Sequence, residues 1–426
     1  MLRKLLEHRL VKDTLVLLGV QLTGYVLPLI TLPYLTRVLG PANFGLMALG
    51  TAMTLYFAVI IDYGFAVTGT RQVAIAQHDP EKISQIYSTI MACKLGLLAP
   101  CFLALLGAVA AIPQMRAYWP LYLISFLQAL GFCLSPNWFL QGVQRMRFLA
   151  YSDYTAKIIG VLLIFVLVRR SSDYLVAAAI QSGSYVLSAV TGLFLCFSVL
   201  RLRVVWPTWT GMRAAMLEGW PVFLSMGSMT IMTSSNTMIL GMVTPPEQVG
   251  FLSASSRVII AARGLSNPVA MAVYPHMSRL AVNSPAEGLK FLRRQLLWTT
   301  VPFLAISLGL FAFAPLLVSV LYGPRFAEVA VLLRLMSPVP VVHAVSVCFS
   351  TYYILAYGYE RVWSKIITRM VILNFVLLAV LMLFVRPLRA VAVTTTLTDV
   401  YSAVAAILFF RRTADARAEH KPSPVS

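Results

Sequence analysis

The sequence predicts an all-α, polytopic integral membrane protein that crosses the bilayer about twelve times. Of the 426 residues, 59% are hydrophobic and 12% are charged, and the mean hydropathy is +0.81. A soluble domain carries about 25% charged residues, so the composition excludes a water-soluble globular protein. The high hydrophobicity also excludes a disordered chain. The apolar residues gather in runs of about 20, the length that a helix needs to cross the hydrocarbon core of a bilayer.

Twelve such runs follow one another, and each is expected to be a helix because lipid offers no partner to an unpaired backbone group. They are centred at 14–36, 43–66, 87–110, 117–140, 149–168, 174–200, 219–241, 250–275, 296–320, 330–355, 363–385 and 389–410. Twelve spans occupy roughly 240 residues, which leaves no room for a soluble catalytic domain of ordinary size. Prolines inside the runs predict kinks, at Pro28, Pro33, Pro100, Pro136, Pro268, Pro338 and Pro340.

Basic residues are distributed unevenly between alternate loops, which predicts the orientation of the chain. One set of segments, which includes both tails, holds 22 Lys and Arg, and the opposite set holds 7. Cytoplasmic loops carry such an excess, so both termini are expected in the cytoplasm and the number of spans is expected to be even. The same bias accounts for most of the net charge of +19, so this charge does not indicate a nucleic-acid partner.

A weak internal repeat divides the chain into two halves. LGPANFGLMAL (39–49) follows the first span and LGMVTPPEQVGFLSAS (240–255) follows the seventh, and both contain Leu-Gly, then Pro, then Gly. Six spans per half would give the halves one orientation, as in parallel repeats, although Gly and Pro open many helices and chance is the alternative. We expect an amino-terminal six-helix lobe at 1–205, a carboxyl-terminal six-helix lobe at 206–413 and a cytoplasmic tail at 414–426.

Several charged residues fall inside the predicted spans, where each costs at least about 2.5–3.5 kcal/mol. Arg263 and Asp399 lie near the midplane of the eighth and twelfth spans, with Arg257 six residues before Arg263. They predict a hydrated cavity with a positive wall, and one buried Arg263–Asp399 ion pair is the alternative. Asp62 lies near the inner end of its span, where a cap or a salt bridge competes with a functional role. The residues that could reach the headgroups by snorkelling are Lys94, Arg334 and Arg369.

Polar residues recur at helical spacing on the first span of each half. The first span carries Gln21 on such a stripe, and the seventh carries Asn236. The stripes predict cavity walls if the halves rock against each other, and helix packing through small and polar residues is the alternative. The five cysteines lie in or beside apolar runs, so we expect small buried side chains, no disulfide framework and no metal site.

Three stretches of the first 150 residues together resemble Wzx-type O-antigen flippases, polysaccharide-biosynthesis exporters of the multidrug/oligosaccharidyl-lipid/polysaccharide superfamily. They are PLITLPYLTRVLGPANFGLMAL (28–49), DYGFAVTGTRQVA (62–74) and SPNWFLQGVQRM (135–146). The carboxyl half is similar mainly in its pattern of spans. The resemblance implies two six-helix lobes around a central cavity. It also implies that an undecaprenyl-pyrophosphate-linked oligosaccharide is flipped from the cytoplasmic to the periplasmic leaflet of a bacterial inner membrane.

The resemblance further implies a cationic lumen, to which Arg257, Arg263 and Arg369 would contribute. The motif residues of the family, for which a structural role is the alternative, fall on Asp62, Gly64, Arg71, Trp138, Gln141 and Gly142. We expect alternating access and no cofactor. An H+ or Na+ gradient is a candidate driving force, with Asp399 or Asp62 as the ion-binding group. A polysaccharide polymerase and a chain-length regulator are candidate partners.

Two rival functions stay open at this point. A multidrug or cation exporter of the same superfamily would need an acidic cavity, whereas basic residues outnumber acidic ones five to two inside these spans. A membrane glycan polymerase would need acid and base residues on a sizeable outer loop. The outer loops are short, and the five histidines are scattered along the chain. The sequence therefore predicts a transporter rather than an enzyme.

Overall fold

The computed structural model describes the backbone of residues 2–199 and 202–418, with the side chains of 2–29, 146, 229, 232–233 and 414–418 left outside the description. Every regular element within these residues is helical, which confirms the predicted all-α class. Nine helical segments of the described part are long and apolar enough to span a bilayer. Within the described residues, each of the twelve predicted spans lies mainly on helix, so the membrane class is confirmed as well.

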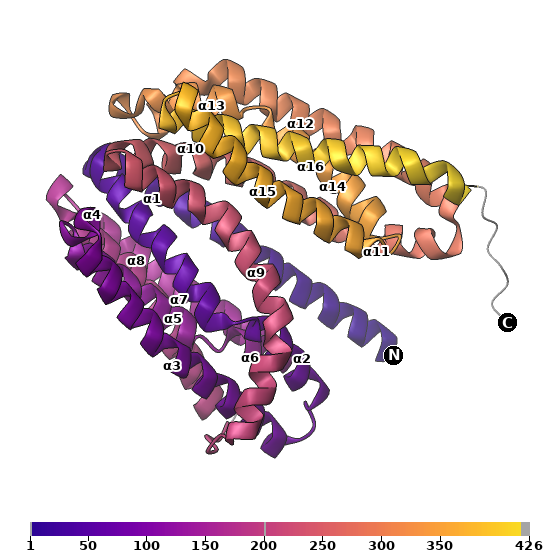
Figure 1. The fold of residues 1–426 in the computed structure, drawn as a ribbon. Helices are drawn as coiled ribbons and strands as arrows, with labels where there is room; N and C mark the ends of the chain where they lie inside the picture. The colour runs from indigo at the N-terminus through magenta and orange to yellow at the C-terminus, as the bar shows by residue number, and fades with distance from the viewer. Residues whose placement is uncertain (1, 200–201, 419–426) are drawn as a thin grey trace. The chain divides into compact units, whose positions relative to one another are not determined.

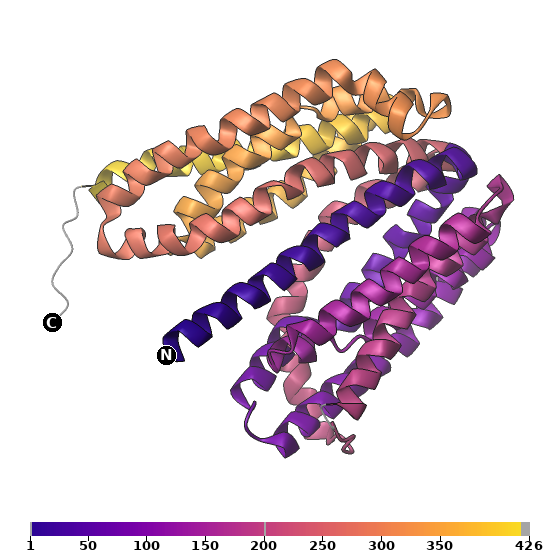
Figure 2. The same ribbon diagram turned by 180° about the vertical axis from the view of Figure 1, so that it is seen from behind.

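The first compact unit comprises Met1–Gly250. Its elements are α1 (Leu2–Asp62), α2 (Phe65–Ile75), α3 (Pro80–Ala111), α4 (Pro113–Arg116), α5 (Trp119–Leu134), α6 (Asn137–Gly142), α7 (Met146–Leu167), η1 (Ser171–Asp173), α8 (Tyr174–Ser198) and α9 (Trp209–Val243). Helix α8 packs against α5 and α7 (Figure 2), and α1 packs against α5 and α9. The seventh predicted span, α9, therefore belongs to the same compact unit as the first six.

The second compact unit comprises Phe251–Ser426. Its elements are most of α10 (Pro246–Gly264), then α11 (Ser266–Asn283), α12 (Pro285–Leu321), η2 (Pro324–Phe326), α13 (Glu328–Met336), α14 (Val339–Phe349), η3 (Ser350–Leu355), α15 (Glu360–Phe384) and α16 (Pro387–Ala418). Helix α16 packs against α14 and α15, and α12 packs against α14 (Figure 1). The two compact units are defined by contacts between residues, and contacts alone do not show to which repeat α9 belongs. The lobe boundary predicted at residue 205 therefore stays a prediction.

Several predicted spans are interrupted, and the interruptions have local causes. The first two spans form one element, α1, with a kink at Gly40, whose φ of 74° suits glycine because it lacks a Cβ. The fourth span divides into α5 and α6 at Pro136. The eighth divides into α10 and α11 at Leu265, three residues before Pro268. A proline has no N–H for the carbonyl four residues earlier, so Pro268 leaves the Gly264 carbonyl without its helical donor.

Candidate functional site

A charged pair lies where α1 turns into α2. The Asp62 Oδ1 atom lies 3.3 Å from the Lys94 Nζ atom on α3, and the Lys94 ammonium also donates to the Phe132 carbonyl at 3.4 Å. The Asp62 Oδ2 atom accepts the Ala66 backbone N–H at 3.3 Å. Asp62 therefore acts as a helix cap and as an ion-pair partner, the two structural roles considered from the sequence.

Lys94 is buried, and only 2% of it is exposed. Snorkelling to the headgroups, the alternative considered for Lys94 from the sequence, is therefore not what its side chain does. An ammonium group inside a helical bundle needs a counter-charge, because its desolvation is costly. Asp62 supplies this charge. The sequence contains one signal for this pair. Lys94 is a lone lysine deep in the third predicted span, and Asp62 is an acid near the same inner end of the second.

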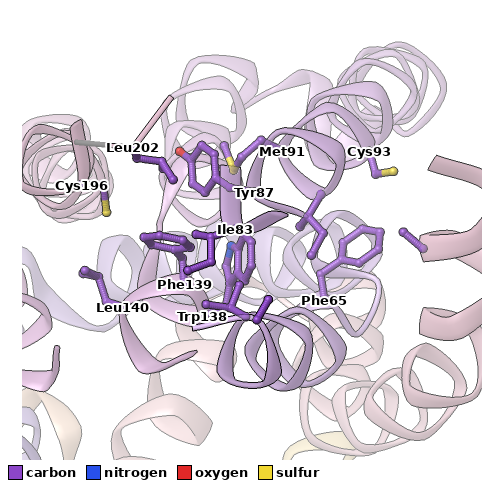
Figure 3. Close-up of a cluster of buried hydrophobic side chains, with 14 of the residues drawn as sticks. Phe65, Ile83, Tyr87, Met91, Cys93, Trp138, Phe139, Leu140, Cys196 and Leu202 are labelled. Atoms are coloured by element: carbon purple, nitrogen blue, oxygen red, sulfur yellow. The ribbon is translucent and has the colours of Figure 1, made fainter. Parts of the chain in front are cut away.

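Helices α2 and α6, which carry the second and third family-like stretches, interlock in a buried core (Figure 3). The Thr70 hydroxyl donates to the Trp138 carbonyl at 2.9 Å. A Cβ on Gly69 would lie 2.7 Å from the Trp138 ring, and one on Gly142 would lie 2.7 Å from the Val73 side chain. Trp138 itself is 3% exposed and stacks near Tyr87. Trp138 and Gly142 thus lie in the packing between two helices, as the structural role considered for them from the sequence requires.

Replacing Gly69 with alanine should destabilise this core. The new methyl would meet the Trp138 ring and Ile90, and overpacking of this kind costs about 1–3 kcal/mol. The matched control is Gly183→Ala in α8, where a Cβ would meet nothing within 4 Å and alanine favours the helix by up to about 1 kcal/mol. Thermal unfolding in detergent should move the two melting temperatures in opposite directions. Equal melting temperatures would contradict the packing role of Gly69.

The two repeat-like stretches meet in a reciprocal contact within the first unit. A Cβ on Gly45 would clash with the Pro246 carbonyl oxygen and lie 2.7 Å from the Gly250 nitrogen. A Cβ on Gly250 would clash with the Pro41 carbonyl oxygen and lie 3.2 Å from the Gly45 nitrogen. Pro41 and Gly45 each lie 205 residues before their counterparts, Pro246 and Gly250. The glycines of the shared Leu-Gly, Pro, Gly pattern therefore lie at a close backbone approach, and the parallel-repeat interpretation stays a prediction.

A second charged pair lies in the second unit. The Arg263 Nη2 group, in the last turn of α10, donates to the Asp399 Oδ2 atom of α16. The side chains are 26% and 12% exposed, respectively. The buried Nε of Arg263 has no hydrogen-bond partner among the described atoms. Ion pairing, the alternative considered from the sequence, is thus present, and one guanidinium donor is left unused.

The remaining predicted site residues are spread over both units. Arg71 and Gln141 are exposed on α2 and α6, and Asn236 is partly buried on α9. In the second unit, Arg257 is partly buried on α10 and Arg369 is exposed on α15. Gln21 lies on α1, and its side chain is outside the described residues. Among the described residues, no group of three His, Cys, Asp or Glu could hold a metal ion, and the five cysteines are buried free thiols.

A family model described as "Polysaccharide biosynthesis protein" matches residues 10–281. The chain belongs to this family. It is 27% identical over 401 residues to a protein of Escherichia coli (strain K12) named "Putative O-antigen transporter", and the match covers 94% of this chain and 96% of that protein. A Shigella dysenteriae protein of the same name is 28% identical over 83% of this chain and 88% of its own. The resemblance to Wzx-type flippases is thereby confirmed, and the chain is a transporter rather than an enzyme.

Two solved structures share the fold. A multidrug resistance MATE family transporter of the MOP superfamily, in an inward-facing conformation, superposes with a TM-score of 0.73 at 15% identity, covering 93% of this chain and 96% of that one. The lipid II flippase MurJ, in an inward closed conformation, gives 0.53 at 15% identity over 94% and 84%. At these identities the likeness concerns the fold alone. A drug exporter and a lipid flippase share it, so the cargo depends on the side chains.

Proposed function

We propose that this protein flips an undecaprenyl-pyrophosphate-linked oligosaccharide, the repeat unit of O-antigen or a related surface polysaccharide. Transport runs from the cytoplasmic to the periplasmic leaflet of the bacterial inner membrane by alternating access, with both termini in the cytoplasm. The observation that carries the proposal is Arg263, a partly exposed guanidinium at a helix break inside an apolar bundle. Family membership supports the polysaccharide cargo.

The chemistry of the cargo fits this arginine. A pyrophosphate and a polar glycan cannot cross roughly 30 Å of hydrocarbon unaided, because each polar group would lose its hydration. A guanidinium makes paired, charge-assisted hydrogen bonds to phosphate oxygens. Arg263 binds the phosphate-bearing head while the polyprenyl tail stays in the lipid. A cation exporter would instead be expected to present acidic groups to its cargo, because a guanidinium repels cations.

Two accessory features belong to the same proposal. A proton or sodium gradient drives the return of the empty transporter, and Asp399 or Asp62 binds the ion. A polysaccharide polymerase and a chain-length regulator receive the flipped units on the periplasmic side. Arg257 and Arg369 add positive charge along the path of the head.

To test this proposal, the gene is deleted and the leaflet in which the lipid-linked repeat unit accumulates is determined. A membrane-impermeant lectin is applied to spheroplasts, which expose the periplasmic leaflet, and to inverted vesicles, which expose the cytoplasmic leaflet. We expect surface polysaccharide to disappear and the unit to accumulate on the cytoplasmic side. Arg263→Gln should fail to restore export. Arg325→Gln, which removes an exposed arginine within η2, should restore it. Periplasmic accumulation of unpolymerised units would favour a polymerase, and raised drug sensitivity with normal polysaccharide would favour an exporter.

A further inference from the structure

We propose that Asp399 is an internal substitute for the phosphate of the cargo. The carboxylate pairs with Arg263 while the site is empty, the incoming phosphate displaces it, and it returns to the arginine when the phosphate leaves. This inference rests on the proposed function, in which Arg263 binds the phosphate-bearing head.

The place of the pair favours exchange over a fixed structural contact. Arg263 is the penultimate residue of α10, and the helix breaks one residue after Gly264, where Pro268 removes a backbone donor. The Ser266 hydroxyl, just past this interruption, donates to the Arg263 carbonyl at 2.7 Å. Interrupted helices in transporters commonly lie at substrate and ion sites, because free backbone groups and hinge residues meet there. Arg263 therefore lies on a segment that can adjust when its partner changes.

The Arg263–Asp399 pair is also incomplete. A guanidinium offers five N–H donors in a planar fork, and here Nη2 bonds to one carboxylate oxygen while the buried Nε lacks a described partner. An unsatisfied buried donor is unfavourable, so a ligand with more acceptor oxygens has an advantage over the carboxylate. A pyrophosphate carries such oxygens and a larger negative charge. About a quarter of the Arg263 side chain is exposed, so a ligand can reach it.

An exchange of partners also meets an energetic requirement of transport. An unpaired arginine within a membrane bundle would be costly in the empty protein, and Asp399 removes that cost. The same carboxylate competes with bound phosphate, which keeps the cargo from binding so tightly that it cannot leave.

The experiment measures binding of inorganic pyrophosphate to the purified full-length protein in detergent, by equilibrium dialysis. Asp399→Asn removes the competitor and keeps the side-chain shape, so the dissociation constant should fall at least about tenfold. Arg263→Gln, alone or combined with Asp399→Asn, should abolish binding. The matched control is Glu328→Gln. It removes the same charge from another carboxylate, whose Oε1 atom lies 3.2 Å from the Nη2 atom of Arg389 on α16. It should leave the dissociation constant unchanged.

The outcomes separate this inference from the proposed function. If Arg263→Gln abolishes binding while Asp399→Asn, still folded by thermal unfolding, binds no more tightly than the original protein, Asp399 only positions Arg263 and the exchange is overturned. If Arg263→Gln binds pyrophosphate unchanged, the phosphate site lies elsewhere, and the assignment of Arg263 fails together with the exchange. An equal gain from Glu328→Gln would show a general charge effect and would also overturn the exchange.

Discussion

Replacing Gly45 or Gly250 with alanine is expected to destabilise the protein strongly. Each new methyl would clash with a backbone carbonyl of the opposing segment, Pro246 for Gly45 and Pro41 for Gly250. A side chain can rotate away from an added methyl, whereas a carbonyl within a helical turn moves only with its helix. Overpacking costs about 1–3 kcal/mol, and we expect both variants at or above the upper end of that range.

Thermal unfolding in detergent, with the amount of membrane-inserted protein as a second readout, would test this expectation. Gly96→Ala in α3 is the matched control, since a Cβ there would meet nothing within 4 Å. That variant should be neutral or slightly more stable, because alanine favours helix over glycine. If Gly45→Ala and Gly96→Ala have the same melting temperature, the two segments do not pack as closely as the structure describes.

The two partners of the Asp62–Lys94 pair should respond unequally to neutralisation. Asp62→Asn keeps an oxygen that can accept the Ala66 N–H, but it leaves the buried Lys94 ammonium without a counter-ion. Removing one partner of a buried pair costs about 3–5 kcal/mol. Lys94→Met should cost less, because the Asp62 side chain is 33% exposed and water can solvate its carboxylate.

The double variant Asp62→Asn with Lys94→Met gives the decisive comparison. It contains no unpaired buried charge, so its free energy of unfolding should recover towards that of the original protein. Unfolding monitored in detergent would provide all four values of the cycle. A double variant that is as unstable as the sum of the single variants would show that the pair does not interact, and it would contradict this assignment.

Part of the candidate site was accessible from the sequence. The sequence identifies Arg263 and Asp399 as midplane charges, with an ion pair as one alternative, because an unpaired charge deep in a span is costly. Their actual pairing was not predictable, since the two residues are 136 positions apart and the rotation of each helix decides whether they meet. The burial of Lys94 is not predictable from the sequence for the same reason. Its depth along the helix allowed snorkelling, but its face of α3 points into the bundle.

Membrane insertion, the all-helical class and the approximate position of each span were determined by the sequence alone, because hydrophobicity and length are local properties. The tertiary structure decided which residues meet. Gly45 and Gly250 come together across 205 residues because two helix openings cross at backbone contact, a distance that no periodicity encodes. The tertiary structure likewise places the Trp138 side chain in the buried packing between α2 and α6. A helix face is apolar whether it meets lipid or another helix, so hydrophobicity locates a span without specifying its neighbours.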